Sequence, residues 1–183
     1  MRKIIKYLII VIIGFVVAYL IAQVTNKYNE KKEAEIRIQT LPDVDFASVL
    51  GDSISLQDFD SGRSLVLIYF HPECEHCQYE AKEIGLRADE FNNCQLVMIT
   101  PDDSLARIEK FCEQYHLQEI DNLEVLLDRD SKFELTFGNA VLPSVYIYDK
   151  GQKLKKQFLG ETKPEAIVAE IGSDSDTQVL ESE

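Results

Sequence analysis

Two cysteines lie two residues apart in the segment Cys74-Glu75-His76-Cys77, directly after an apolar run at residues 64–70. Cysteine pairs at this spacing act as redox couples, bind metals or form structural disulfides. A redox couple needs one accessible thiolate that attacks a disulfide and a second thiol that releases the product. The chemistry of this pair therefore depends on the elements that position the two sulfur atoms.

The residues after Pro72 predict a helix that runs to about Asn92. Its apolar residues recur at spacings of three or four and form one stripe (Cys77, Ala81, Ile84, Ala88 and Phe91). Cys74 then lies at the helix N-terminus, where unpaired backbone N–H groups and the helix dipole favour a thiolate. We expect Cys74 to be the accessible nucleophile and Cys77, on the buried stripe, to resolve the mixed disulfide.

Other interpretations of the pair have weaker support. His71, Cys74, His76 and Cys77 could supply four zinc ligands, but structural zinc sites usually take two ligands from a distant segment, so we predict no metal. A purely structural disulfide across two residues would constrain the unfolded chain little. The net effect of the nearby charges on the thiolate stays open, because His76 favours it whereas the flanking carboxylates oppose it (Glu73, Glu75 and Glu80).

The order of elements predicts an α/β fold, a mixed sheet with helices on both faces. Short apolar runs indicate buried strands, and the segments between them have helical spacing and capping residues such as Ser131 and Glu134. A turn at Lys150-Gly151-Gln152, with positive φ expected at the glycine, indicates a hairpin. The predicted strands are residues 64–70, 95–100, 122–128, 144–149 and 153–160, and the later helices are residues 101–115, 131–138 and 163–172.

The N-terminus predicts a transmembrane helix. Residues 7–26 are uncharged and mostly apolar, and a helix of this length spans about 30 Å of hydrocarbon. Arg2, Lys3 and Lys6 precede it and favour a cytoplasmic N-terminus, although a cleaved signal peptide is an alternative. The predicted division is a signal anchor at 1–26, a tether at 27–40, one domain at 41–172 and a disordered acidic tail at 173–183.

The overall charge argues against one class of partner. The chain has 183 residues, with 32 acidic and 19 basic residues and a formal net charge of -13. Affinity for nucleic acid comes mainly from Lys and Arg that neutralise phosphates, so we predict no nucleic-acid partner.

Together these features resemble the thioredoxin fold and, within it, the TlpA-like and ResA-like membrane-anchored thiol-disulfide oxidoreductases. The resemblance rests on the strand that ends at Phe70, the cysteine pair, Glu80, and the segment FGNAVLPSVYIYDKGQ that leads to Gly160. It implies that Pro143 follows a cis bond beside the cysteines and that Leu142, Pro143 and His76 contact the substrate. It also implies that Glu80 accepts a proton from Cys77. Glu73 departs from the pattern, because the family has an aromatic residue before the first cysteine.

The resemblance implies an enzyme that reduces disulfides of proteins outside the cytoplasm. Its only cofactor would be the redox-active Cys74–Cys77 disulfide, and a membrane thiol relay would donate electrons. We expect a single-pass protein of the bacterial inner membrane, with its domain in the periplasm or outside the cell. The alternatives are an oxidase or isomerase on the same fold, or a binding module without turnover. A peroxidase is disfavoured because the chain lacks a Pro-x-x-x-Thr/Ser-x-x-Cys arrangement.

Two further cysteines and one histidine lie outside this mechanism. Cys94 opens a predicted strand and Cys112 lies late in the next helix, so both are expected near one end of the domain. We favour two buried thiols over a second disulfide. His71 is expected to pack in the position of a family aromatic residue rather than to act in catalysis.

Overall fold

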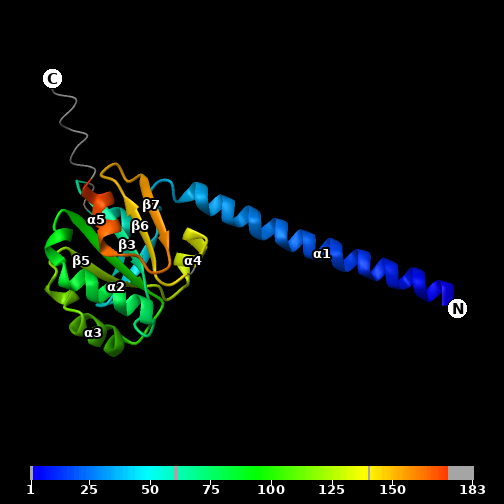
Figure 1. The fold of residues 1–183 in the computed structure, drawn as a ribbon, viewed down its shortest axis with the longest axis horizontal. Coiled ribbons are helices and arrows are strands. Elements are labelled where there is room, and N and C mark those ends of the chain that lie inside the picture. The colour runs from blue at the N-terminus through cyan, green and yellow to red at the C-terminus, as the bar shows by residue number, and fades with distance from the viewer. Residues whose placement is uncertain (1, 60–61, 140, 173–183) are drawn as a thin grey trace, which may run out of the picture.

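The computed structural model describes residues 2–59, 62–139 and 141–172. Within these residues one seven-stranded sheet has the order β2-β1-β5-β4-β3-β6-β7 (Figure 1). Its strands are β1 Asp45–Ser48, β2 Ser53–Ser55, β3 Ser64–Tyr69, β4 Cys94–Thr100, β5 Leu123–Leu127, β6 Ser144–Tyr148 and β7 Leu154–Leu159. The helices are α1 Arg2–Arg37, α2 Glu75–Leu86, α3 Leu105–Gln114, α4 Lys132–Phe137 and α5 Pro164–Gly172.

The centre of the sheet is parallel and its edges are antiparallel. β3 pairs in parallel with β4 and β4 with β5, whereas β6 and β7 form the predicted antiparallel hairpin on the other side of β3. Every residue of β3 and β6 is buried, as expected for central strands covered on both faces. The β1–β2 pair, which extends the sheet beyond β5, was not predicted because its short strands lack a continuous apolar run.

Two buried clusters lie on opposite faces of the sheet. One contains apolar residues of α2, α3 and α5 against alternate residues of β3 and β4. The other contains Phe133 and Phe137 of α4, together with Ile38 and Leu41, against the remaining alternate residues. The predicted mixed sheet with helices on both faces is therefore confirmed.

Helix α1 projects from the domain as a single rod (Figure 1). It contains 36 residues and is therefore about 54 Å long. Where the structure describes side chains, which excludes residues 1–6 and 8–11, no helix is long and apolar enough to cross a membrane. The transmembrane helix predicted at residues 7–26 is thus not confirmed.

The segment predicted to be a tether, residues 27–40, differs from expectation. Its first part continues α1, and its last residues pack on the domain, with Ala34 and Ile38 buried. The Arg37 guanidinium donates a 2.6 Å hydrogen bond to the Leu135 carbonyl oxygen at the end of α4. Tyr148 donates its hydroxyl proton to the Ile38 carbonyl oxygen at 3.1 Å. The charged composition predicted a tether without specifying its conformation; Glu and Lys are good helix formers, and the tether residues up to Arg37 are helical.

Two local predictions were wrong in detail. The expected capping box at Ser131 is absent, because Ser131 has a positive φ and makes no side-chain cap; the Asp128 carboxylate accepts from the N–H groups of Lys132 and Phe133 instead. In the β6–β7 turn, the residue with positive φ is Gln152, not Gly151. The predicted helix end at Gly138 is confirmed, with φ 75°. The predicted acidic tail, 173–183, lies outside the described residues.

Candidate active site

Cys74 occupies the N-cap position of α2, as predicted. After β3, the chain turns sharply, and the Cys74 N–H donates to the His71 carbonyl oxygen at 3.0 Å. The Cys74 carbonyl oxygen accepts the first α-helical hydrogen bond, from Gln78 N–H at 2.9 Å. Because Cys74 is half-buried and is a free thiol, its sulfur combines access to solvent with a position at the positive end of the helix dipole.

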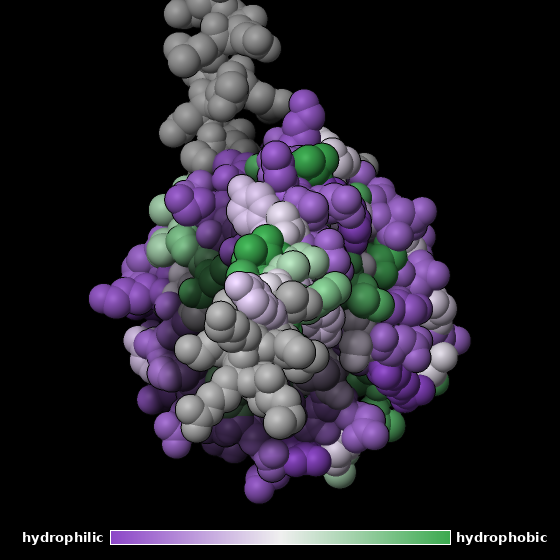
Figure 2. Space-filling model, turned by 90° about the vertical axis from the view of Figure 1, so that its right-hand side faces the viewer, coloured by the Kyte–Doolittle hydropathy of each residue, from purple (hydrophilic) through white to green (hydrophobic). Residues whose placement is uncertain are grey.

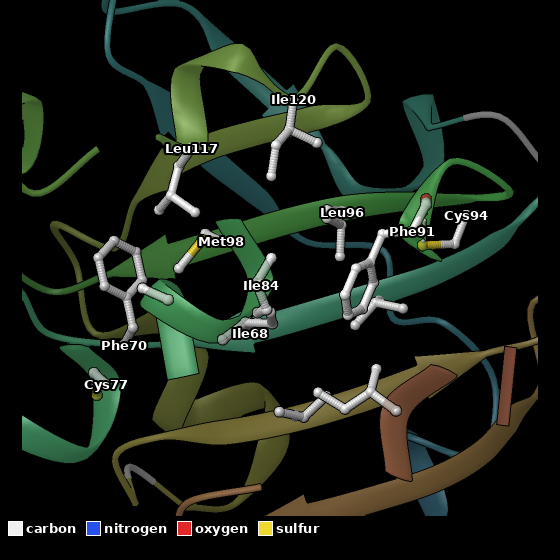
Figure 3. Packing of buried hydrophobic residues seen from close by; sticks show 14 of the residues in the cluster. Ile68, Phe70, Cys77, Ile84, Phe91, Cys94, Leu96, Met98, Leu117 and Ile120 are labelled. Carbon is white, nitrogen blue, oxygen red and sulfur yellow. Dashed lines mark hydrogen bonds between the residues drawn. The ribbon is translucent and has the colours of Figure 1, made fainter. Parts of the chain in front are cut away.

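Cys77 lies one turn later on the buried face of the same helix. Its side chain belongs to the cluster under α2 and lies on the Phe70 side of that cluster in Figure 3. Burial raises the pKa of the Cys77 thiol well above its usual value, and the charge of Glu80 raises it further. The backbone N–H of His71 opposes this rise. Cys77 therefore needs a proton acceptor before it can attack as a thiolate.

Glu80 is a buried carboxylic acid on the same helix. Its residue is 1% exposed, and neither carboxyl oxygen has a hydrogen-bond partner among the described residues. Burial raises the Glu80 pKa to about 8. The backbone N–H of Thr162 partly offsets this rise without reaching hydrogen-bond geometry, and the charge of Glu161 adds to it. Few buried acids lack partners, so Glu80 has the character of a functional group.

The bond between Leu142 and Pro143 is cis, as the family resemblance implies. The register of β6 on β3 pairs Ser144 with Tyr69, which places Pro143 at the end of the sheet where the chain leaves β3 for the cysteines. Leu142 packs against the cluster that contains Cys77. The Pro143 carbonyl oxygen already accepts a hydrogen bond from Gly160 N–H at 2.8 Å.

The two histidines near the cysteines have separate partners. His76 Nδ1 lies 2.6 Å from Glu161 Oε2, in the loop between β7 and α5. His71 Nδ1 accepts the Glu73 backbone N–H, and His71 Nε2 lies 3.9 Å from Asp102 Oδ2. Among the residues that the structure describes, no group of three or more His, Cys, Asp or Glu side chains is placed to hold a metal ion.

Sequence reasoning missed the contribution of α3 to this region. Arg107 pairs with Glu73, with 2.7 Å between Nη1 and Oε1, and with the buried carboxylate of Asp102, with 2.8 Å between Nε and Oδ2. The one sequence signal for this contact was Glu73, which stands where the family has an aromatic residue. The sequence does not show which helix supplies its partner.

Cys94 and Cys112 are both free thiols; Cys94 is buried, as predicted, whereas Cys112 is half-buried. Cys94 is fully buried and donates to the Phe91 carbonyl oxygen. Cys112 lines a cavity of about 390 Å³ between α3 and β5, together with Ile108 and Val125. Burial raises the pKa of Cys94 to about 12 and that of Cys112 to about 11, so neither favours a thiolate near neutral pH.

The sequence profile of the AhpC/TSA family matches residues 38–157, which include the cysteine pair and the cis-proline. The chain belongs to the AhpC/TSA family. The matched region begins where α1 meets the domain and ends within β7.

Curated relatives of this AhpC/TSA protein span nearly the whole chain. The thiol-disulfide oxidoreductase ResA of Bacillus thuringiensis is 21% identical, with 91% of this chain and 92% of that protein covered. Among solved structures, a putative thioredoxin from Neisseria meningitidis has a TM-score of 0.61 at 22% identity, covering 74% of this chain and 89% of that one. A secreted disulfide oxidoreductase of Mycobacterium tuberculosis has a TM-score of 0.60 at 18% identity, covering 75% and 97%. The fold of this AhpC/TSA protein is therefore thioredoxin-like.

Proposed function

We propose that this protein is a membrane-anchored thiol-disulfide oxidoreductase that reduces disulfides of proteins outside the cytoplasm. The observation that carries the proposal is the arrangement on α2: an accessible thiol at the N-cap, a buried thiol one turn later, and one turn beyond that a buried carboxyl group without hydrogen-bond partners among the described residues. The activity named for the ResA relatives supports the same chemistry.

The first step is the attack of the Cys74 thiolate on one sulfur of a substrate disulfide. The substrate S–S bond breaks, a mixed disulfide forms between Cys74 and the substrate, and the other substrate sulfur leaves as a thiolate. In this proposal Leu142 and Pro143, at the same end of the sheet, contact the substrate chain around the attacked sulfur, and His76 contacts it as well.

The second step needs the Cys77 thiolate. In this proposal the ionised Glu80 carboxylate takes the Cys77 proton, and Cys77 attacks the Cys74 sulfur. The mixed disulfide breaks, a Cys74–Cys77 disulfide forms, and the second substrate sulfur leaves as a thiolate. Two electrons pass from the protein dithiol to the substrate disulfide, and a thiol relay in the membrane would return two electrons.

The reducing direction is supported by the negative charges around the motif. A strong oxidant needs its reduced form to be stabilised, usually through a very stable thiolate. Glu75 directly follows Cys74 in the first turn of α2, and its carboxylate opposes a second negative charge there. A redox titration of the pair against glutathione decides the direction: a potential near about -120 mV, typical of strong oxidants, would exclude the reductase role.

Membrane anchorage is supported by the surface of α1. Its described apolar side chains, such as Ile12, Phe15 and Leu20, are exposed on a helix that contacts the domain only near its C-terminal end. Figure 2 views the molecule from the side on which α1 projects and shows apolar atoms gathered near the centre of a largely hydrophilic surface. An exposed apolar rod is costly in water and stable in a bilayer. Recovery of the full chain in the carbonate-washed membrane fraction is the expected result, and release by carbonate would contradict anchorage.

Cysteine variants test the exchange mechanism. Cys77→Ser should accumulate mixed disulfides with substrates through Cys74, because the resolving thiol is missing. Cys74→Ser should lose insulin reduction completely. Cys94→Ser serves as the matched control, since that thiol is buried and lies outside the motif; it should reduce insulin as wild type does and accumulate no mixed disulfide. Full insulin reduction by Cys74→Ser would overturn the mechanism.

A further inference from the structure

The segment before the nucleophile, residues 71–73, is held by a network of charges that reaches it from α3. Asp102, in the loop between β4 and α3, has a side chain that is only 3% exposed. Buried carboxylates require a compensating partner. Arg107 provides a charge partner, with its Nε 2.8 Å from Asp102 Oδ2, although this oxygen has no hydrogen bond among the described residues. The guanidinium, whose side chain is 42% exposed, is thus paired on one side with a buried carboxylate.

The same guanidinium extends to the residue next to Cys74. Arg107 Nη1 lies 2.7 Å from Glu73 Oε1, and the hydrogen bond to Glu73 is the main cause of the raised Arg107 pKa. The planar guanidinium can pair with two carboxylates at once, which a lysine ammonium does less well. Arg107 thus neutralises Glu73, the acidic side chain adjacent to the nucleophile in the chain.

The main chain of the segment is held by a second contact with the same network. The His71 ring accepts the backbone N–H of Glu73 at 3.2 Å, and its other nitrogen faces Asp102 at 3.9 Å. The side chain of Glu73 is therefore held by Arg107 and its backbone N–H by His71, and both of these partners lie within 4 Å of Asp102. This double attachment fixes the direction from which the chain enters Cys74.

We propose that Arg107 is a positioning residue that sets the reactivity of Cys74 by holding and neutralising Glu73. Without Arg107, the carboxylates of Glu73 and Asp102 would lose the cation that they share. Their negative charges would then act on the Cys74 thiolate that forms during exchange. Like charges disfavour that thiolate, and a destabilised reduced form makes the couple more reducing. The inference rests on the proposed role of Cys74 as the nucleophile, but not on which substrate is reduced.

Other charged groups also face this region, and the test must separate Arg107 from them. They come from α2, from the loop before α3 and from the loop after β7 (Glu75, His76, Glu80, Asp103 and Glu161). None of them is altered in the variants used.

The experiment measures alkylation of Cys74 by iodoacetamide at pH 7 in the reduced full chain in detergent, with the modified peptide identified by mass spectrometry. Arg107→Gln should slow Cys74 alkylation by roughly three- to tenfold, the size expected for unpaired charges near a partly exposed group. Glu73→Gln combined with Arg107→Gln should recover most of the loss. Arg87→Gln is the matched control: Arg87 also bridges two carboxylates, Glu83 and Glu165, but lies at the far end of α2.

The equilibrium with glutathione provides a second measurement that a purely structural role would not reproduce. At alkaline pH, where the Cys74 thiolate predominates, Arg107→Gln should shift the dithiol–disulfide equilibrium toward more reducing values, and a tenfold change in that equilibrium corresponds to about 30 mV. The proposal is overturned if Arg107→Gln changes alkylation less than twofold, if the loss is equal with and without Glu73, or if Arg87→Gln has the same effect. The two proposals can fail separately. If wild-type protein does not reduce insulin but the variants differ from it in alkylation as predicted, the reductase function is refuted and the role of Arg107 is supported.

Discussion

Cys77 and Glu80 lie one helical turn apart on the buried face of α2, and the Glu80 charge contributes to the raised pKa of the Cys77 thiol. Burial thus raises the pKa of both the Cys77 thiol and the Glu80 carboxyl group, and both follow the accessible Cys74 on the same helix. In the proposed mechanism, the release of product depends on this one buried proton acceptor, and the first two predictions concern it.

The resolving step should accelerate as pH rises through about 8. Only the ionised Glu80 can accept the Cys77 proton, and its pKa is raised to about 8 by burial. Glu80→Gln removes the acceptor and should slow resolution of a preformed mixed disulfide by roughly 100-fold, a typical contribution of a general base. Stopped-flow kinetics between pH 6 and 9 measure this step. Glu90→Gln, an exposed change on the segment after α2, should leave the profile unchanged. An identical pH profile in Glu80→Gln would rule out the assigned role.

Glu80 should also make the protein less stable as pH rises. Its pKa is higher in the folded protein than the ordinary value of 4.5, so the folded state holds this proton more tightly than the unfolded chain does. The stabilisation is complete below about pH 4.5 and is lost between pH 4.5 and 8, by on the order of 3–5 kcal/mol. Urea unfolding of wild type and Glu80→Gln at pH 5 and pH 8 measures it. The variant should lack this loss, and parallel curves for the two proteins would contradict the prediction.

Gly138→Ala should loosen the junction between α1 and the domain. Gly138 has φ 75°, and a Cβ built there would lie 2.5 Å from the Cβ of Ala34 in α1. The strain and the overlap should together lower the free energy of unfolding by about 2–4 kcal/mol. Gly160→Ala is the matched control, because Gly160 also has positive φ, 97°, but no atom lies within 4 Å of the added Cβ. Equal losses in the two variants would show that the α1 contact contributes nothing.

Gly85→Ala should be among the most damaging substitutions in α2. An added Cβ would overlap the backbone carbonyl oxygen of Tyr115, which belongs to the main chain and cannot rotate away. We expect a loss of at least about 3 kcal/mol in denaturant unfolding, or failure to fold. Gly172→Ala, where nothing lies within 4 Å, should change stability by less than about 1 kcal/mol. A Gly85→Ala protein as stable as wild type would refute the close approach of α2 to the end of α3.

The four thiols should react in a defined order. Cys74, half-buried at the N-cap, should be alkylated first, and Cys112, half-buried with its pKa raised to about 11, should follow slowly. Cys77 and Cys94 are buried, and burial raises the pKa of each, so both should react only when the protein opens. Time-resolved alkylation of the reduced protein with peptide mapping measures the order. Early labelling of Cys94 would be incompatible with its burial.

Local patterns were enough to predict much of the fold. The strands β3, β4 and β5 followed from apolar runs, and the position of Cys74 at the start of α2 followed from the spacing of the stripe that contains Cys77. These predictions succeed because helix and strand periodicity depend on neighbours in the chain. The paired short strands β1 and β2 and the helical form of residues 27–37 were missed, because their stability comes from contacts with distant segments.

The sequence by itself determined the redox pair, its order on the helix, and an acid three residues after the second cysteine, since each of these depends only on spacing along one helix. Only the tertiary structure decided that Glu80 is buried without a partner, that Pro143 reaches the end of the sheet from which the cysteines follow, and that Arg107 neutralises Glu73. The reason is physical: desolvation and charge pairing depend on which distant segments pack against a residue, and spacing along the chain carries no information about them.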